Sequence, residues 1–233
     1  MIEVRKFDTL GHADHGWLNA RHHFSFADYF DPERTQWGLL RVWNDDQIAP
    51  KSGFPRHGHR DMEIITYVRK GAITHRDSMG NEGVTRAGDV QVMSAGGGVL
   101  HEEWNEQDEA TELFQIWILP REGGGDPNWA AAQFPKGDRA GKLEVLASGR
   151  PGRKALPIRT DGELLAGTLN PGDEIIYDIE PGRFVYLVPA TGAVTVNDVA
   201  LKTRDGAAIT GEPQITIKAI EESEVVLVDT AGA

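Results

Sequence analysis

The sequence of 233 residues predicts an all-β protein made of two tandem, jelly-roll-like β-barrels with few short helices. One observation behind this prediction is the density of glycine: 27 glycines separate short runs rich in β-branched and aromatic side chains. Such runs, divided by turn residues, are typical of antiparallel sandwiches and barrels. The second observation is an internal repeat. Gly-Ala-Ile-Thr at 71–74 resembles Gly-Ala-Val-Thr at 192–195, and Thr-Arg-Ala-Gly at 85–88 resembles Thr-Arg-Asp-Gly at 203–206, which indicates a duplicated unit.

The expected elements follow from this pattern in chain order. In the first half we expect strands at residues 64–68, 72–75, 90–93 and 113–119. One segment, 126–133, predicts a helix, because Asp126 offers an N-cap, Pro127 suits the first turn and alanines follow. The polar, glycine-rich stretch from there to Pro157 is typical of a connection. In the second half we expect strands at residues 163–167, 174–177, 183–188, 193–196, 214–217 and 224–228.

Composition excludes several classes of protein. There are no cysteines, which excludes disulfides, thiolate zinc sites, iron–sulfur clusters and cysteine nucleophiles, and fits a reducing cytoplasm. The net charge of −12 opposes nucleic-acid binding, because phosphate contacts need clustered lysine and arginine. No stretch approaches the roughly 18 apolar residues of a membrane span, and the N-terminus lacks the apolar region of a signal peptide. We therefore expect a cytoplasmic protein that binds neither nucleic acid nor membrane.

The histidines point to a metal site in the first half. All eight lie in the first 101 residues. His57 and His59 are two residues apart, so on a strand they project from the same face, and His101 and Glu103 repeat that spacing. Two such pairs on neighbouring strands can converge on one interior ion. Three nitrogens and one oxygen suit Fe, Mn, Ni, Cu or Zn, and a six-coordinate ion would keep two positions open.

The spacing leaves alternatives. An isolated His-x-His motif is more often a surface pair than a metal site, by roughly 3 to 1, and only its conjunction with a second pair favours a site. Glu63 lies four residues after His59 and, by the same parity, would share its strand face. Spacing alone therefore does not decide whether Glu63 or Glu103 is the carboxylate ligand.

Other polar motifs are expected to be structural. The segment His-His-Phe-Ser-Phe at 22–26 predicts a strand with packed aromatics, and a histidine at the rim of the cavity is the minor alternative. We expect His-Arg-Asp at 75–77 to form a hydrogen-bonded cluster on a hairpin. The three glycines at 96–98 should allow a tight turn just before His101.

The second half shows no comparable ligand set. Shifting the ligand positions by the repeat offset leads to Tyr177, Ile179 and Lys218, which are not a plausible set of metal ligands. We therefore divide the chain into three parts: an N-terminal barrel with the metal site at 1–125, a connection with a short helix at 126–157, and a C-terminal barrel without metal ligands at 158–233.

These motifs resemble those of a known superfamily. His57-Gly58-His59-x3-Glu63, followed by Gly98-x2-His101-x3-Asn105, resembles the two signature motifs of the cupins, although Glu63 and Gly71 are one residue further apart than usual and the proline of the second motif is missing. More narrowly, the chain is similar to the pirin family, the two-cupin branch. The segments that carry this resemblance cover most of positions 17–119 and are 21–29, 57–63, 75–78, 94–103 and 115–117. The C-terminal half matches only in general character.

The resemblance implies two cupin barrels that face each other and a ligand set of His57, His59, His101 and Glu103, with Glu63 orienting a histidine. Bacterial members are similar to quercetin 2,3-dioxygenases, which open a flavonol ring with O2 and release CO. This implies one divalent metal, with iron the first choice and Cu, Mn, Ni, Co or Zn as others, and a small phenol or flavonol as substrate. Glu103 would then act as ligand and general base.

The resemblance also implies an alternative from another class. Eukaryotic pirins act as metal-dependent regulators that bind other proteins, and this chain would then need a protein partner rather than turnover. A third reading keeps the metal and replaces the flavonol by another small enol or phenol.

Overall fold

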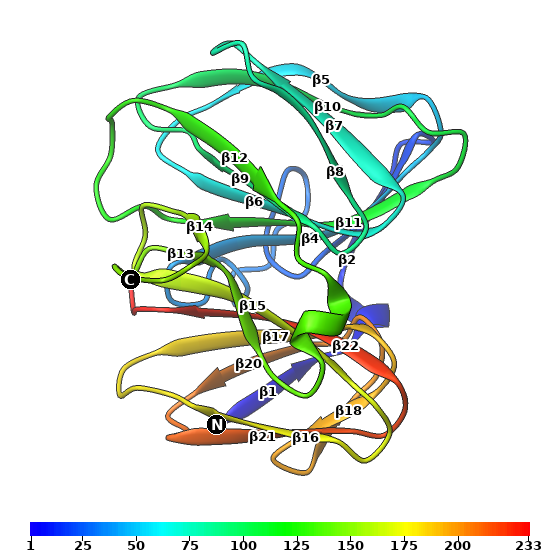
Figure 1. Cartoon of the computed structure of the whole chain (residues 1–233), viewed down its shortest axis with the longest axis vertical. Coiled ribbons are helices and arrows are strands. Elements are labelled where there is room, and N and C mark those ends of the chain that lie inside the picture. The colour runs from blue at the N-terminus through cyan, green and yellow to red at the C-terminus, as the bar shows by residue number, and fades with distance from the viewer.

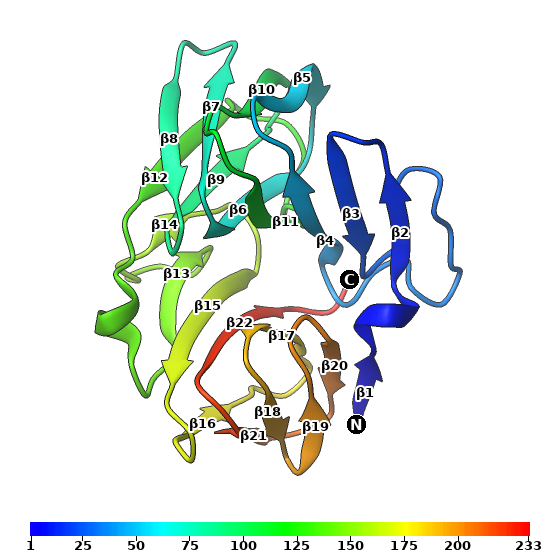
Figure 2. The same cartoon turned by 90° about the vertical axis from the view of Figure 1, so that its right-hand side faces the viewer.

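The computed structural model describes residues 1–233 and shows a nearly all-β molecule arranged in four layers (Figures 1 and 2). Apart from the first strand, which joins a sheet of the second half, each half of the chain forms one seven-stranded and one four-stranded sheet. The two seven-stranded sheets form the inner layers and face each other, whereas the four-stranded sheets lie outside. This arrangement confirms the predicted all-β fold of two tandem units. None of the helical segments has the length and apolar character needed to cross a membrane.

The first half forms the upper two layers in Figure 1. Its seven-stranded sheet contains β2 (Gly11–Asp14), β3 (Leu18–His22), β4 (Leu40–Ile48), β6 (Glu63–Lys70), β9 (Val90–Ser94), β11 (Thr111–Ile118) and β12 (Asn128–Ala132). Its four-stranded sheet contains β5 (Ser52–His59), β7 (Ala72–Asp77), β8 (Glu82–Arg86) and β10 (Val99–Asn105).

The second half forms the lower two layers. Its seven-stranded sheet contains β1 (Ile2–Arg5), β13 (Glu144–Ser148), β14 (Leu156–Pro157), β15 (Gly162–Leu169), β17 (Phe184–Thr191), β20 (Gly206–Thr210) and β22 (Ser223–Thr230). Its four-stranded sheet contains β16 (Glu174–Asp178), β18 (Val194–Val196), β19 (Val199–Leu201) and β21 (Gln214–Ala219). Two 3-10 turns, η1 (Phe7–Thr9) and η2 (Lys136–Arg139), complete the structure.

The two halves share one topology. The order β9-β6-β11-β4-β3 in the first large sheet corresponds to β20-β17-β22-β15-β13 in the second, and β5-β10-β7-β8 corresponds to β16-β21-β18-β19. This correspondence is the structural form of the internal repeat. One strand lies in the sheet of the other half: β1, at the start of the chain, pairs with β20 of the second half. The division of the chain at residues 125 and 158 otherwise stays a prediction.

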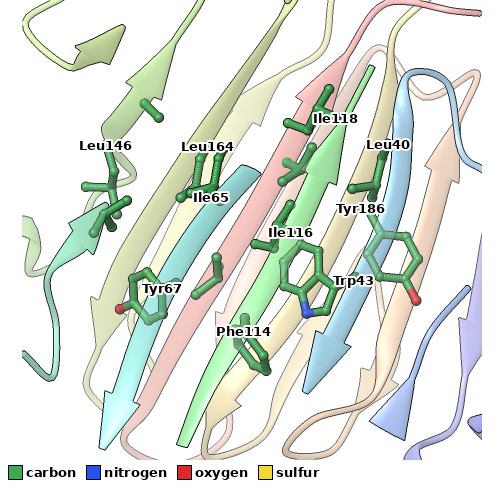
Figure 3. Close-up of a cluster of buried hydrophobic side chains, with 14 of the residues drawn as sticks. Leu40, Trp43, Ile65, Tyr67, Phe114, Ile116, Ile118, Leu146, Leu164 and Tyr186 are labelled. Atoms are coloured by element: carbon green, nitrogen blue, oxygen red, sulfur yellow. The ribbon is translucent and has the colours of Figure 1, made fainter. Parts of the chain in front are cut away.

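The main hydrophobic core lies between the two large sheets, where 22 buried residues pack together. Figure 3 shows side chains of both sheets meeting there, with Trp43 close to Phe114 and Tyr186. The Trp43 ring lies 5.3 Å from the Phe114 ring and 5.5 Å from the Tyr186 ring. Full burial of a large apolar side chain is worth about 1.5–3 kcal/mol, so this layer holds the halves together.

The interiors of the two halves differ. The second half is filled by a cluster of 16 buried apolar residues. The first half has two separate clusters, of six and four residues. Strand β11 shows the reason: Phe114 and Ile116 point to the core between the halves, while the alternating Gln115 and Trp117 line a cavity inside the first half.

The helix predicted for residues 126–133 is wrong, because strand β12 occupies that segment and pairs with β9. The edge of β9 offers backbone partners that local helix propensity cannot anticipate. In this pairing Trp129 stacks on His75, with ring centroids 4.9 Å apart and an interplanar angle of 7°. Gly83 leaves room for the indole, since a Cβ there would clash with it.

Candidate metal centre

Three histidines converge on one point between β5 and β10. The two strands are antiparallel neighbours, with His101 opposite His57 and Val99 opposite His59. Ligand nitrogens of His57, His59 and His101 all lie within 4.8 Å of one another. The Nε2 atoms of His57 and His101 are 3.1 Å apart. The i, i+2 spacing of the first pair thus places both rings on the same face, as the sequence predicted.

Glycine backbone prepares the turn that leads into β10. Gly96 and Gly98 have φ angles of 50° and 144°, which side chains rarely adopt. A Cβ on Gly96 would also clash with the carbonyl oxygen of Gly125. A β-bulge between His101 and Glu103 then shifts the register against β5. The three glycines at 96–98 therefore have the tight-turn role predicted for them.

The electrostatics of the cluster fit a bound cation. Burial, followed by the proximity of His57 and His75, lowers the pKa of His101 to about 3. Burial, followed by His101 and His57, lowers the pKa of His59 to about 4. Both imidazoles are therefore neutral near pH 7 and offer lone pairs, which is the form that binds a metal. The donor set suits a divalent transition metal.

Groups behind the cluster fix two of the rings. The Nδ1 of His57 lies 2.7 Å from the carbonyl oxygen of Pro55, so this nitrogen donates and leaves Nε2 free to face the cluster. The Nδ1 of His101 lies 3.5 Å from Nδ1 of His75. The Nε2 of His75 in turn lies 3.0 Å from a carboxylate oxygen of Asp77. The polar cluster predicted at residues 75–77 is confirmed, and it lies against a candidate ligand.

Burial alone would raise the pKa of Asp77, but hydrogen bonds from Asn81 and His75 outweigh it and lower the pKa. Asp77 therefore stays an anion that holds the His75 ring in place. This carboxylate–histidine–histidine series resembles the outer partners that orient ligands in metal sites.

Glu103 lines the same cavity but lies outside the three-nitrogen cluster. Its Oε1 accepts hydrogen bonds from Gln91 Nε2 at 2.6 Å and from Thr66 Oγ1 at 3.1 Å. Its Oε2 accepts one from Gln115 Nε2 at 2.8 Å. Since each carboxylate oxygen has two lone pairs, Oε2 keeps one for a further partner. The Thr66 hydroxyl also lies 3.1 Å from Gln115 Oε1, and when it donates there, Oε1 of Glu103 keeps a lone pair as well. The structure thus brings together three of the four predicted ligands, and the role of Glu103 stays a prediction.

Glu63 does not have the role predicted for it. The chain turns after His59, with Asp61 at a φ of 50°, and Glu63 begins β6 in the other sheet. Its Oε2 accepts hydrogen bonds from Ser94 Oγ at 2.6 Å and from the backbone N–H of Arg159 at 2.9 Å. Glu63 therefore neither shares a strand face with His59 nor orients a histidine.

A cavity of about 320 Å³ extends from the three histidines into the first half. It is open enough for a small molecule and falls at the low end of typical ligand sites. Its lining combines apolar walls with a few polar groups: Leu18, Ala20, His22, Phe26, Asn44, Asp46, Phe54, Pro55, Ile64, Gln115 and Trp117, besides the histidines and Glu103. The Trp117 ring lies 4.9 Å from His59 and 5.4 Å from Phe26, so aromatic side chains border the cluster.

Sequence reasoning missed the contribution of β4 to this cavity. Asn44 and Asp46 alternate with Trp43 and Asp45, so the even-numbered side chains face the cavity. Four polar residues in succession, 44–47, within a β-strand are the sequence signal for this contribution. His22 also lines the cavity, and its Nδ1 lies 2.8 Å from Asn44 Oδ1, which corresponds to the minor alternative considered for the segment 22–26. The strand predicted for that segment is wrong, because β3 ends at His22.

The corresponding positions of the second half carry other side chains. Tyr177 lies opposite Ile215, as His57 lies opposite His101. Ile217 lies opposite Val196, as Glu103 lies opposite His75. Ile215 and Ile217 are fully buried in the apolar core of the second half. Of the two related halves, the first therefore has a cavity with polar side chains, and the second is filled by apolar side chains.

Comparison with known proteins gives consistent results along the whole chain. Residues 3–118 match the family described as Pirin, and residues 145–230 match the description Quercetinase C-terminal cupin domain. A pirin-like protein of Caulobacter vibrioides is 59% identical over 99% of this chain and 100% of its own. The quercetin 2,3-dioxygenase of Escherichia coli K12 is 43% identical, with 98% of each chain covered. The crystal structure of the bacterial pirin YhhW from Escherichia coli, in complex with nickel(II), has a TM-score of 0.94 at 40% identity and covers 100% of both chains.

Proposed function

The chain belongs to the pirin family, and on this basis we propose that it is a metal-dependent dioxygenase that cleaves quercetin or a similar flavonol with O2 and releases CO. The observation that carries this proposal is the cluster of His57, His59 and His101 at the end of a cavity with aromatic walls. The name quercetin 2,3-dioxygenase of the Escherichia coli relative supports the same reaction.

We assign the metal to His57, His59, His101 and Glu103. The nickel(II) complex of YhhW supports a divalent transition metal, and iron is our first choice, with Cu, Mn, Ni, Co or Zn as others. When bound, the metal supplies a Lewis acid that lowers the pKa of a coordinated hydroxyl. The three imidazoles would hold it from one side, which leaves the cavity side open to a ligand.

In this proposal Glu103 would take the proton of the 3-hydroxyl of the flavonol. Gln91 and Gln115 hold its carboxylate with short amide hydrogen bonds, so the group needs no reorganisation to act. A base must lie within hydrogen-bond reach of its proton, and Glu103 borders the cavity two residues after His101 on β10. Both glutamine amides donate, which fixes the direction of the carboxylate.

The cavity walls would position the rings and exclude water. Phe26, Ile64 and Trp117 present apolar surface beside the histidines. Planar aromatic ligands gain by burying their faces on such walls. The chain's own residues would therefore bind and orient the flavonol, hold the accepted proton on Glu103 and keep the site dry.

Turnover under controlled oxygen tests the proposal. Protein loaded separately with Fe, Cu, Mn, Ni, Co or Zn is mixed with quercetin without O2, and O2 is then admitted. We expect the flavonol absorption band to persist until O2 is present and then to bleach, with one CO released per quercetin. His12→Ala, at an exposed histidine, is the matched control for His101→Ala, which should lose both metal and turnover. No bleaching with any metal would contradict the proposal, and a stoichiometric protein partner without turnover would support the regulatory alternative.

A further inference from the structure

Two neighbouring aspartates on β4 point to opposite sides of the large sheet. Asp45 faces the second half, where its carboxylate pairs with Arg69 and Arg204. Asp46 faces the other way and lines the cavity that holds the histidines. The two carboxyl groups therefore lie on opposite faces of the sheet: that of Asp45 is paired with arginines, and that of Asp46 is directed into the cavity.

The carboxyl of Asp46 has no partner of its own. The residue is 2% exposed, and its Oδ1 is buried without a hydrogen bond. Its register neighbours on the flanking strands are Ala20 and Leu113, which offer no polar side chain. Glu103, in the same cavity, receives hydrogen bonds from three side chains. Of the two carboxyl groups that line the cavity, Glu103 has hydrogen-bond partners and Asp46 has none.

A buried polar group without a hydrogen bond destabilises the folded protein, so its presence in a cavity is explained where a ligand can supply the missing partner. Burial, followed by the nearby charges of Asp45 and Glu103, raises the pKa of Asp46 well above its usual value. A buried carboxyl that keeps its proton can donate a hydrogen bond, and it can accept one through its other oxygen.

We propose that Asp46 determines ligand specificity by hydrogen-bonding a hydroxyl of the ligand other than the one held at the histidine cluster. This inference rests on the proposed function and deepens it: the preferred substrate is a planar aromatic with at least two hydroxyls, one for the metal and one for Asp46. A site built to bind a hydroxyl discriminates against a ligand that lacks it, because the polar group is then left unpaired.

Ligand binding, rather than turnover, tests this assignment. The probes are quercetin and 3-hydroxyflavone, which keeps the 3-hydroxyl and lacks the others, and the protein carries Zn(II) and is kept without O2. We compare the native chain with Asp46→Leu and Asp46→Asn by isothermal titration, with zinc content measured for each. Asp46→Leu should weaken quercetin binding about 5- to 10-fold and leave 3-hydroxyflavone nearly unchanged, since one neutral hydrogen bond is lost. Asp46→Asn, which still donates and accepts, should keep most of the preference.

Equal weakening of both ligands by Asp46→Leu, or no weakening of either, overturns the assignment. Should the leucine variant fail to fold, a crystal structure of the native chain with quercetin decides. A ligand hydroxyl within hydrogen-bond distance of Asp46 is expected there, and one more than about 4 Å away overturns the proposal. Suppose that quercetin binds more tightly than 3-hydroxyflavone in an Asp46-dependent way, but no metal gives turnover. That result would contradict the dioxygenase proposal and still support the role of Asp46 in binding. A failure of one proposal can therefore be told from a failure of the other.

Discussion

His75 shows how single residues set the geometry of the cluster without binding metal. One face of its ring is covered by Trp129, its Nε2 faces Asp77, and its Nδ1 faces His101. With one face and both nitrogens in contact with neighbours, the ring has little freedom to rotate. The orientation of His101 therefore depends on a residue that does not belong to the three-nitrogen cluster.

Replacing His75 by alanine should weaken metal binding about 10- to 100-fold, because loss of an outer partner lets the ligand ring reorient. The measurement is the Kd for Ni(II) or Zn(II) from competition with a chromophoric chelator. Replacing the exposed His12 should leave the Kd unchanged. An unchanged Kd in His75→Ala would mean that the strands alone orient His101.

Asp46→Leu should also stabilise the metal-free protein, by about 1–3 kcal/mol in the free energy of unfolding, because it removes an unsatisfied buried carboxyl. The adjacent Asp45→Leu is the matched control. It leaves Arg69 and Arg204 without their partner and should destabilise by about 3–5 kcal/mol. Urea unfolding measures both. An equal fall in the free energy of unfolding in both variants would show that Asp46 has a stabilising partner.

At the level of elements, β11 divides two tasks by alternation. Phe114 packs in the core between the halves, and the next residue, Gln115, holds Glu103 in the cavity. A single strand thus connects the packing of the halves to the position of the candidate base.

Phe114→Ala should lower the free energy of unfolding by about 3–5 kcal/mol while metal affinity stays the same. Gln115→Leu should have the opposite profile: a small effect on unfolding and a tenfold or larger fall in kcat, since Glu103 loses an amide donor. Urea unfolding and steady-state kinetics on the metal-loaded protein separate the two. A loss of metal from Phe114→Ala would show that alternation does not keep these tasks apart.

The same alternation explains what the sequence could and could not predict. The histidine cluster could be predicted, because residues two apart on a strand point to the same face whatever the rest of the fold. His57 and His59 both lie on β5, and His101 lies on β10. Parity failed for Glu63, because the left-handed turn at Asp61 ends the strand first. The helix at 126–133 could not be rejected locally, since its hydrogen-bond partners are on β9, more than thirty residues earlier.

Asp46 illustrates a different limit. Its direction follows from strand parity, but its lack of a partner depends on Ala20 and Leu113, which come from two other strands. Which polar residue remains unpaired is a property of strand register, and register is set by the whole sheet. The fold class and the cluster of three histidines could therefore be predicted, whereas the polar lining of the cavity could not.

For the whole molecule, the contact between the halves contains a buried histidine. His23 is fully buried, its Nδ1 lies 2.8 Å from the Tyr186 hydroxyl of the second half, and burial, followed by the charge of Arg5, keeps its pKa well below the usual value. The folded protein therefore keeps His23 neutral at a pH where the unfolded chain binds a proton.

It follows that stability falls as the pH decreases below about 6.5, by up to about 1.4 kcal/mol per pH unit for this one residue, and that this effect is absent above that pH. We expect His23→Gln to show a shallower decline between pH 7.5 and 5 in urea unfolding of the metal-free protein. His22, His59 and His101 have lowered pKa values as well, so the difference between the two proteins isolates His23. Identical slopes would contradict the prediction.

The pairing of β1 with β20 also bears on how the chain matures during synthesis. Ile2 lies opposite Ile209, so this strand has no partner until residues 206–210 have left the ribosome. The first half can therefore form its own two sheets during synthesis, while residues 2–5 remain unpaired until the second half has formed its large sheet. Pulse-labelled nascent chains halted before residue 206 should accordingly expose residues 2–5 to protease, and chains released at full length should protect them.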